Sequence, residues 1–258
     1  MVLYPLNSPE RTREDFVPAW DAIERRQKQA ATQWWLTAQP DHAVLAGDLA
    51  SRISSPEFPQ LDSHLLRAIA LHDEGWAQFD GGSAPKLNDQ GRPLSFLEAA
   101  PPDFVSAWRG SIERVAHLAP MGGIMVSEHF CRIARARLQA FRDTPSATRM
   151  IRDFLKVETE RQRQLSLGLR HSAAEISVLI DVLQFCDLLS LYFCCGSQDS
   201  VDFPQKFNGC TIRLRREAEL CRMQPPLFEP GVSLAVRARR YPAVREPHVM
   251  NIPILLGQ

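Results

Sequence analysis

Four side chains of this sequence are of types that bind divalent metal ions and fall at positions that should face a protein interior: His42, His72, Asp73 and Asp187. His72 and Asp73 lie at the centre of Leu65–Phe79, where apolar residues recur at helical spacing. A carboxylate in an apolar interior is costly unless it is paired or coordinates a metal. A structural role is also open for the His-Asp pair alone, because it could cap a core helix or reach a nearby arginine.

Asp187 is a second carboxylate expected in an apolar interior, because it lies in the most apolar helix predicted for the chain, Ala173 to Cys195. Its neighbours on one face of that helix are aliphatic: Ile180, Leu183 and Leu191. His42 lies on the apolar stripe of another predicted helix, His42 to Ile53. Three helices are therefore expected to present imidazole and carboxylate groups to the interior, a combination that suits Mn, Fe, Zn or Mg alike.

Two further residues are candidates for catalysis. His129 lies on the apolar stripe of the predicted helix Ile124–Ala140, so it should face inward. It could bind a second metal, donate a proton to a leaving group or pack as a structural residue. Arg92 lies in a long loop, Asp80–Pro93, that leaves the end of the His-Asp helix. A guanidinium can clamp phosphate in a bidentate fork, and an exposed loop arginine without a role is the equal alternative.

Glu74 and His117 are weaker candidates. Glu74 follows the His-Asp pair, but it lies about 200° round the helix axis from His72 and is poorly placed to act as a base there. His117 neighbours Val115 and Leu118, which is compatible with a packed structural histidine.

Capping residues and chain breakers place the ends of the predicted helices. Asp62 or Ser63 can cap the central helix and Asp41 the helix from His42, because their side-chain oxygens accept hydrogen bonds from the first N–H groups. The stretch 120–123 should break the chain before the His129 helix. Three further helices are predicted from apolar periodicity: Asp15 to Ala31, Phe104–Leu118 and Ser146–Leu167.

After Gly196 the sequence changes to short β-like alternations separated by prolines. The predicted strands there are Thr211–Leu214, Leu227–Phe228, Val232–Ala238 and Ile252–Leu256. Val2–Leu6 and Gln33–Ala38 show the same β-like pattern. If the C-terminal strands pair with either segment, they will be joined to the helical core. We therefore predict a single domain, 1–258, that is mainly α, with a helical core at about 33–196 and a small β appendage formed by the N-terminal segments and about 197–258.

The composition is that of a soluble globular protein, with 258 residues, 45% of them hydrophobic and 23% charged. The 30 basic and 30 acidic residues cancel, so no global charge points to nucleic acid or to a membrane surface. The N-terminus lacks the pattern of a secretion signal, and the six cysteines lack zinc-binding spacing. We expect a cytoplasmic protein with a small-molecule substrate and no nucleic-acid or membrane partner, and the sequence does not specify an oligomeric state.

The order His … His-Asp … Asp on successive inward helices resembles the HD superfamily of metal-dependent phosphohydrolases and the related HD-domain oxygenases that use two irons. The local sequences QPDHAVLAGDLA, AIALHDEGW, GRPLSFLE, VSEHF and CDLLSL look like those of one uncharacterised bacterial HD-like family. The resemblance covers most of residues 30–195 and part of the tail. It implies that the helical core, about 33–196, is HD-like and that His42, His72, Asp73 and Asp187 bind one divalent metal ion.

The first expectation for the reaction is hydrolysis of a phosphate ester, either a nucleotide or another small phosphorylated metabolite. A divalent metal activates water and polarises a phosphoryl oxygen, which is the chemistry that this hydrolysis needs. Two alternatives stay open, namely a two-iron oxygenase and a non-catalytic HD-like module that binds a ligand or a partner. A two-iron site would normally need two extra histidines between Asp73 and Asp187, for which His117 and His129 are the candidates.

Overall fold

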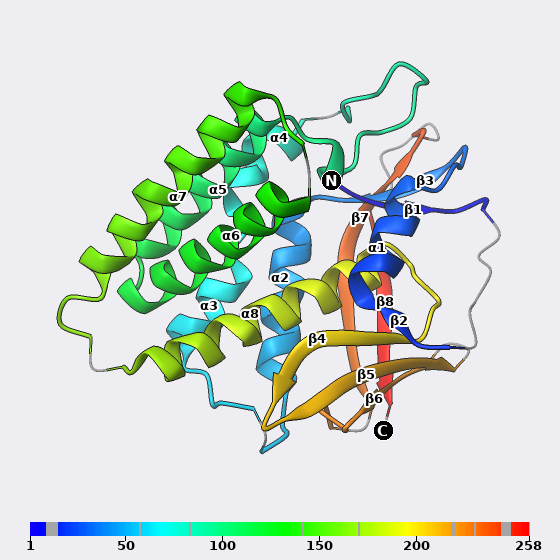
Figure 1. The fold of residues 1–258 in the computed structure, drawn as a ribbon. Coiled ribbons are helices and arrows are strands. Elements are labelled where there is room, and N and C mark those ends of the chain that lie inside the picture. Colours follow the sequence, from blue (N-terminus) through cyan, green and yellow to red (C-terminus); the bar gives the residue numbers. More distant parts are fainter. Residues whose placement is uncertain are drawn as a thin grey trace.

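A helical body packs beside a long, curved β-sheet in the computed structural model (Figure 1). The structure describes residues 1–8, 15–56, 58–82, 84–140, 142–169, 171–217, 220–229, 231–243 and 249–257. The helices are α1 (Ala19–Lys28), α2 (Gln39–Arg52), α3 (Ser63–Ala70), α4 (Ala77–Asp80), α5 (Pro101–Ala116), α6 (Pro120–Ala140), α7 (Pro145–Leu165), α8 (Ala173–Cys194) and the short 3-10 helices η1 (Glu74–Trp76) and η2 (Phe96–Glu98). The strands are β1 (Val2–Pro5), β2 (Val17–Pro18), β3 (Trp34–Thr37), β4 (Val201–Phe207), β5 (Cys210–Glu217), β6 (Leu220–Gln224), β7 (Val232–Tyr241) and β8 (Val249–Gly257).

These strands form one eight-stranded sheet in the order β1-β3-β7-β8-β6-β5-β4-β2. Strand β3 pairs antiparallel with β7 and places Trp34 opposite Tyr241, which confirms the predicted pairing between Gln33–Ala38 and the tail. At the other end of the sheet, β2 pairs in parallel with β4. Both edges of the sheet are therefore N-terminal strands, and its centre comes from the C-terminal part of the chain.

The predicted fold class, mainly α with a small β appendage, is wrong, because the fold is mixed α/β. Three strands escaped the sequence prediction, namely β2, which lies within the predicted helix Asp15 to Ala31, and the strands β4 and β6. β4 carries Pro204 at its centre, and β6 contains no β-branched residue, so neither has the usual local signature of a strand. Leu227–Phe228 is not a strand, since Phe228 forms an isolated bridge with Ile53. Cross-strand contacts between distant segments outweigh these local patterns.

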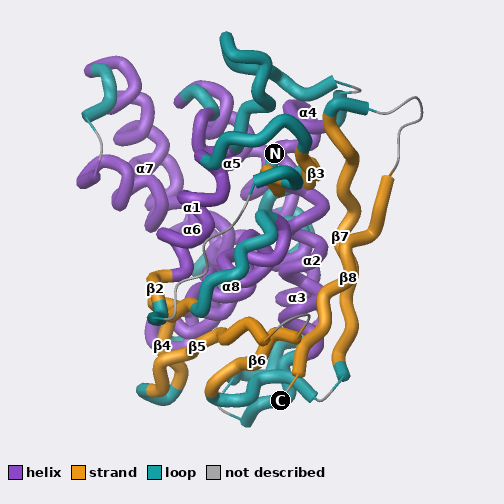
Figure 2. The backbone as a smooth tube through the Cα atoms, turned by 90° about the vertical axis from the view of Figure 1, so that its right-hand side faces the viewer, coloured by secondary structure: helices purple, strands orange, loops and turns teal. Residues whose placement is uncertain are grey.

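The sheet curves around the helical body, with α2 against β7 and α8 against β4 (Figures 1 and 2). Helix α8 begins with a capping box formed by Ser172 and Glu175. Among the described residues it is the helix that is long and apolar enough to cross a membrane, and 67% of its apolar window is buried inside the structure. Its hydrophobicity is therefore that of a core helix, as predicted from the sequence.

Helices α2 and α6 begin earlier than predicted, and each contains a proline in its first turn, Pro40 and Pro120. Proline is tolerated there because the first N–H groups of a helix have no partner within the helix. Gly123 belongs to α6 instead of breaking the chain, and a Cβ on this residue would lie 2.8 Å from Ala116 Cα. The glycine therefore allows α6 to pack closely against the end of α5.

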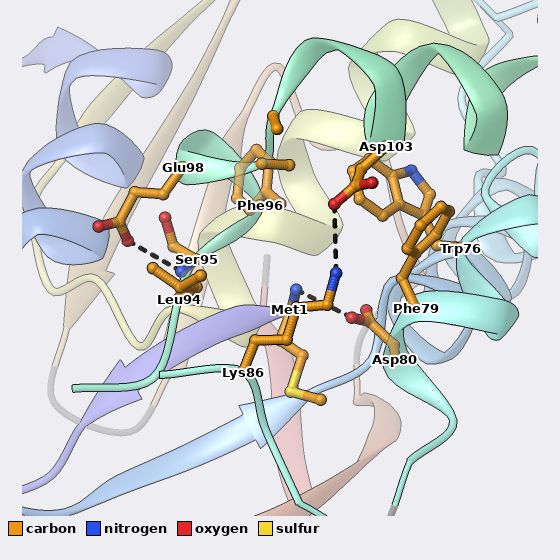
Figure 3. Close-up of a pocket in the computed structure, with 12 residues that line it drawn as sticks. Met1, Trp76, Phe79, Asp80, Lys86, Leu94, Ser95, Phe96, Glu98 and Asp103 are labelled. Atoms are coloured by element: carbon orange, nitrogen blue, oxygen red, sulfur yellow. Dashed lines mark hydrogen bonds and ion pairs between the residues drawn. The ribbon is translucent and has the colours of Figure 1, made fainter. Parts of the chain in front are cut away.

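The segment between α4 and η2 borders a cavity of about 260 Å³ (Figure 3). Within this segment Leu87 and Pro93 form an isolated bridge, and the Asn88 side chain accepts hydrogen bonds from two backbone N–H groups that follow it. The N–H of Phe96 donates to Met1 O at 2.9 Å, which joins η2 to the start of β1. The chain that follows the long loop predicted from the sequence is thus anchored to the residue that precedes β1.

Candidate metal centre

The central stretch Leu65–Phe79 is not one helix, contrary to the prediction. Helix α3 ends at residue 70, and a turn carries His72 and Asp73 before η1 begins. The ring nitrogen Nδ1 of His72 lies 2.7 Å from Ile69 O. The side chain therefore takes the carbonyl group that a continuing helix would offer to the N–H of residue 73.

The residues on either side of this turn hold it in place. Asp62 caps α3, as predicted, by accepting a hydrogen bond from Leu65 N at 2.8 Å. On the other side Gly75 N donates to Ser111 Oγ at 2.9 Å, and a Cβ at Gly75 would lie 2.0 Å from Ala107 O. Glycine is needed here because any side chain would push η1 away from α5 and move the turn.

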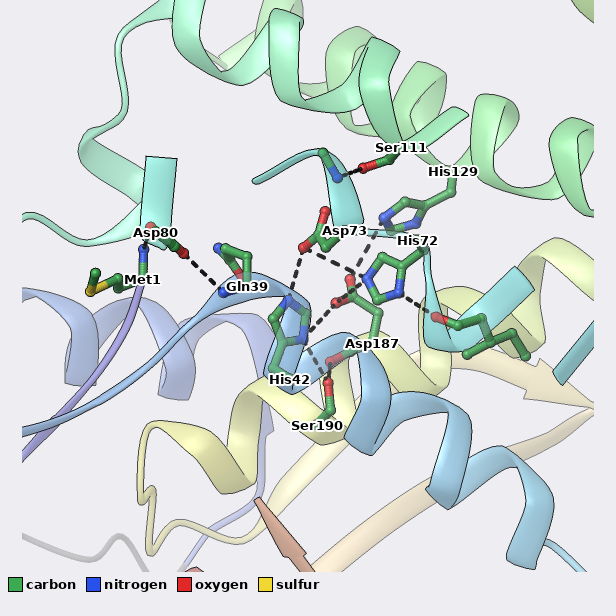
Figure 4. Close-up of polar contacts among 12 residues, drawn as sticks. Met1, Gln39, His42, His72, Asp73, Asp80, Ser111, His129, Asp187 and Ser190 are labelled. Carbon is green, nitrogen blue, oxygen red and sulfur yellow. Dashed lines mark hydrogen bonds and ion pairs between the residues drawn. The ribbon is translucent and has the colours of Figure 1, made fainter. Parts of the chain in front are cut away.

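The side chains of His42, His72, Asp73 and Asp187 converge between α2, α8 and the turn (Figure 4). His42 Nε2 lies 2.8 Å from Asp73 Oδ2, and His72 Nε2 lies 3.4 Å from Asp187 Oδ1. The other two distances, from His42 Nδ1 to Asp187 Oδ1 and from His72 Nε2 to Asp73 Oδ2, are both 3.8 Å. His42, His72 and Asp187 each offer a ligand atom within 4.8 Å of the others, so this buried group could hold a metal ion.

Hydrogen bonds to the far side of each imidazole orient the two histidines. His72 Nδ1 donates to Ile69 O, and His42 Nδ1 lies 3.0 Å from Ser190 Oγ. The Ser190 hydroxyl donates to Asp187 O at 2.8 Å, so its oxygen is left to accept from His42. This network assigns the proton of each neutral ring to Nδ1 and turns both Nε2 lone pairs toward the carboxylates.

Three buried polar atoms of this centre have no hydrogen-bond partner among the described residues: His72 Nε2, Asp73 Oδ1 and His129 Nδ1. A buried polar atom without a partner costs about 1–3 kcal/mol, and native proteins contain few of them. Seven further described atoms share this state elsewhere in the protein, but these three lie in one cluster, where a bound group could supply the missing partners. Two imidazole nitrogens beside two carboxylates fit a divalent metal ion in this respect.

The charges of the centre shift the pKa values of its members in opposite directions. Burial alone would lower the pKa of His72, but the carboxylates of Asp73 and Asp187 outweigh it and raise this pKa to about 9. Burial alone would raise the pKa of Asp187, but the neighbouring histidines, His72 first, lower it to about 2. Without a metal, the centre therefore holds a proton on His72 at neutral pH.

His129 enters the same centre from α6, as its position on the apolar stripe predicted (Figure 4). Its Nε2 lies 3.8 Å from Asp187 Oδ2, and its ring centroid lies 5.5 Å from that of His72. Burial lowers the pKa of His129 to about 4, so the ring is neutral at pH 7. It can therefore offer one N–H group and one lone pair to whatever enters the centre.

The other candidates lie outside this cluster. Arg92 donates to Gln27 O at 3.1 Å and pairs with Glu98 Oε1 at 2.5 Å, and none of its described hydrogen bonds reaches the centre. His117 is exposed at the end of α5, where its Nδ1 lies 2.6 Å from Glu113 O, so it is not the packed core residue that its neighbours indicated.

Ser190 is the member of the centre that the sequence analysis missed. The only sequence signal for it is its position one helical turn after Asp187 on α8. Ser190, His42 and Asp73 form a chain of contacts that resembles a nucleophilic triad. The Ser190 side chain is fully buried and donates its proton to Asp187 O, so it positions His42 and is not a nucleophile.

The fold and the site define a mixed α/β protein with a buried cluster of histidines and aspartates that could hold a metal ion. Residues 26–242 match the model of one family, described as "Protein of unknown function (DUF3891)". The chain belongs to this family, which confirms the resemblance to an uncharacterised family. Comparisons with the curated proteins and with the solved structures found no match.

Proposed function

We propose that the protein is a metal-dependent phosphohydrolase of the HD type, with His42, His72, Asp73 and Asp187 as the ligands of one divalent ion. The 2.8 Å contact between His42 Nε2 and Asp73 Oδ2 is the observation that carries this proposal. The Nδ1 atoms of both histidines are held by protein oxygens, so the Nε2 lone pairs face carboxylate oxygens. Lone pairs that face one another in a buried site repel unless a cation, either a proton or a metal ion, lies between them.

A bound divalent ion would lower the pKa of a water ligand and polarise a phosphoryl oxygen. The chain's own residues supply the rest of the chemistry. Asp73 Oδ1, buried without a described partner, can accept a hydrogen bond from the attacking water and orient it. His129 is neutral at pH 7, so it can donate an N–H hydrogen bond to an oxygen of the phosphate as negative charge develops there.

The burial of the centre supports a small phosphorylated substrate. His42 and His72 retain at most 1% of their surface, whereas Asp73 and Asp187 retain 6% and 8%. The two carboxylates are therefore the more exposed members of the centre, and we propose that one phosphate group of a small metabolite or nucleotide approaches the ion from their side. The six cysteines, which all lie within the described residues, form no disulfide, and this supports our proposal of a cytoplasmic location.

Metal content and phosphatase activity of the same preparation test this function. Protein purified without chelator should contain one Mn, Fe, Zn or Mg ion per chain and hydrolyse a generic phosphate monoester. His72→Ala should lose both, because the ion loses a ligand. His64→Ala, which removes an exposed histidine of α3, should change neither. Bound metal without hydrolysis of any phosphate ester would refute the proposed reaction, and a folded chain without metal would identify a non-catalytic module.

One observation supports a two-iron oxygenase as a second candidate. His129 reaches the cluster from a further helix and lies 3.8 Å from Asp187 Oδ2, where it could serve a second ion. Two irons per chain with oxygen consumption would favour this candidate. His129→Ala separates the two functions, because it should keep the single ion and lose turnover in the hydrolase, but lose one of two metal equivalents in the oxygenase.

A further inference from the structure

A cavity of about 260 Å³ lies beside the segment that carries the metal centre (Figure 3). The aromatic side chains of Trp76, Phe79 and Phe96 line it together with carboxylates. Trp76 belongs to η1, which directly follows Asp73, and its ring meets Phe79 edge-on with centroids 5.8 Å apart. Aromatic faces next to carboxylates form a surface that attracts cations.

A cation of the protein itself already uses this surface. The ammonium nitrogen of Lys86 lies 5.3 Å from the centroid of the Phe79 ring and 3.2 Å from Asp103 Oδ2. The side chain of Lys86 is 61% exposed, and exposed ion pairs of this kind contribute little to stability. Lys86 therefore covers the cavity weakly, and a ligand that makes the same two contacts can displace it.

The other two carboxylates of the cavity are committed to the fold. Asp80 accepts a hydrogen bond from Gln39 N at 2.9 Å, and Glu98 pairs with Arg92 and accepts from Ser95 N. Asp103 differs from both, because its described partner is the exposed Lys86 side chain. Asp103 is thus the charge that a ligand can reach.

We propose that this cavity binds a small organic cation, namely an ammonium group on a short aliphatic chain. The ammonium group takes the place of the Lys86 ammonium between Asp103 and the Phe79 ring, and the aliphatic chain lies against the rings of Trp76 and Phe96. The lysine side chain is itself a butylammonium group, so the contacts of Lys86 show which chemistry the cavity recognises. This binding does not depend on the proposed phosphohydrolase activity.

Titration with n-butylammonium, followed by the NMR signal of the Trp76 indole N–H, tests the proposal. The full chain should bind this probe, and 1-butanol, which has the same shape without the charge, should shift the signal far less. Lys86→Ala should bind the probe about two- to sixfold more tightly, because the competing ammonium group is removed. Asp103→Asn should bind it about tenfold more weakly, because the charged hydrogen bond is lost.

Two charge-matched variants serve as controls: Lys156→Ala and Asp153→Asn, both at exposed positions of α7. Neither should change the affinity for n-butylammonium. The proposal is overturned if Lys86→Ala weakens the binding or leaves it unchanged, or if 1-butanol binds as well as n-butylammonium. It is also overturned if butanoate binds and Lys86→Ala abolishes that binding, since the cavity would then recognise anions through Lys86.

Discussion

Two buried acidic clusters of this protein, both built between helices, differ in how completely their hydrogen bonds are made. Glu158 of α7 is fully buried, and it accepts a hydrogen bond from Ser127 Oγ at 3.0 Å and pairs with Arg161 Nε at 3.0 Å. Gln162 donates to the same serine at 2.9 Å. In the part of the chain that the structure describes, no side-chain atom of this cluster is buried without a partner.

The centre around His72 and Asp73 is also buried, but it leaves three polar atoms without described partners. A cluster that serves only the fold closes its hydrogen bonds internally, because each buried atom left open reduces stability. A centre that binds a ligand must instead keep its lone pairs available. The comparison therefore separates a cluster whose hydrogen bonds are complete from one that is open to a ligand, although both are buried carboxylate groups between helices.

The largest expected effect is that of a substitution that removes the central carboxylate of the Glu158 cluster. Glu158→Ala should lower the free energy of unfolding by about 3–5 kcal/mol, because it leaves the Arg161 guanidinium and the Ser127 hydroxyl without their buried partner. Denaturant unfolding measures this loss. Bound metal should still raise the melting temperature of the variant by as much as that of the original protein.

Glu160→Ala is the matched control, since Glu160 is an exposed glutamate of the same helix that pairs with Arg163. It should change the free energy of unfolding by less than about 1 kcal/mol. If Glu158→Ala were as mild as its control, the Glu158 cluster would not be a structural one and the comparison would fail.

A smaller effect concerns the stability of the metal-free protein as a function of pH. The carboxylates raise the pKa of His72 from 6.5 to about 9 in the folded state, so the native protein binds its proton more tightly than the unfolded chain. The resulting stability is fully present below pH 6.5 and is lost as the pH rises through 9. The loss should amount to about 3 kcal/mol.

Urea unfolding between pH 6 and 10, with and without a divalent metal, measures this dependence. The metal-loaded protein should lack the decrease, because the ion replaces the proton on His72 and the metal affinity rises with pH. A metal-free protein of constant stability across this range would show that His72 is not held between two carboxylates, which contradicts the geometry of the centre.

Much of this centre could be predicted from the sequence, because each of its histidines and aspartates lies in an apolar helical pattern where a charged or polar side chain is unexpected. That signal depends only on local spacing, so it identified His42, Asp187 and the inward face of His129. The break at His72 could not be predicted in the same way. It depends on the contact of Gly75 with α5, and hence on residues more than thirty positions away.

The sheet illustrates the same limit. Its pairing of β3 with β7 brings together segments from the two ends of the chain, and β4 and β6 become strands through their neighbours. Arg92 was a candidate because of its residue type and its loop, but its partners Gln27 and Glu98 could be found only in three dimensions. Tertiary partners decide such positions, and local patterns do not contain them.

The smallest expected effect tests whether a single hydroxyl orients the candidate metal centre. Ser190→Ala removes the oxygen that accepts from His42 Nδ1, so His42 can turn or change its tautomer. Loss of such a partner behind a metal-binding histidine should weaken metal affinity by about tenfold. The free energy of unfolding of the metal-free protein should change little by comparison. The carbonyl group of Asp187 loses the Ser190 hydroxyl as a donor, but it remains part of the helical backbone of α8. Calorimetric titration with Mn²⁺ or Zn²⁺ measures the affinity.

Ser177→Ala, on the same helix, removes a hydroxyl that contacts Arg132, away from the centre, and it should leave metal affinity unchanged. Equal metal affinity in Ser190→Ala and Ser177→Ala would mean that the hydroxyl does not orient His42, and the proposed assignment of its Nε2 as a ligand would lose its support.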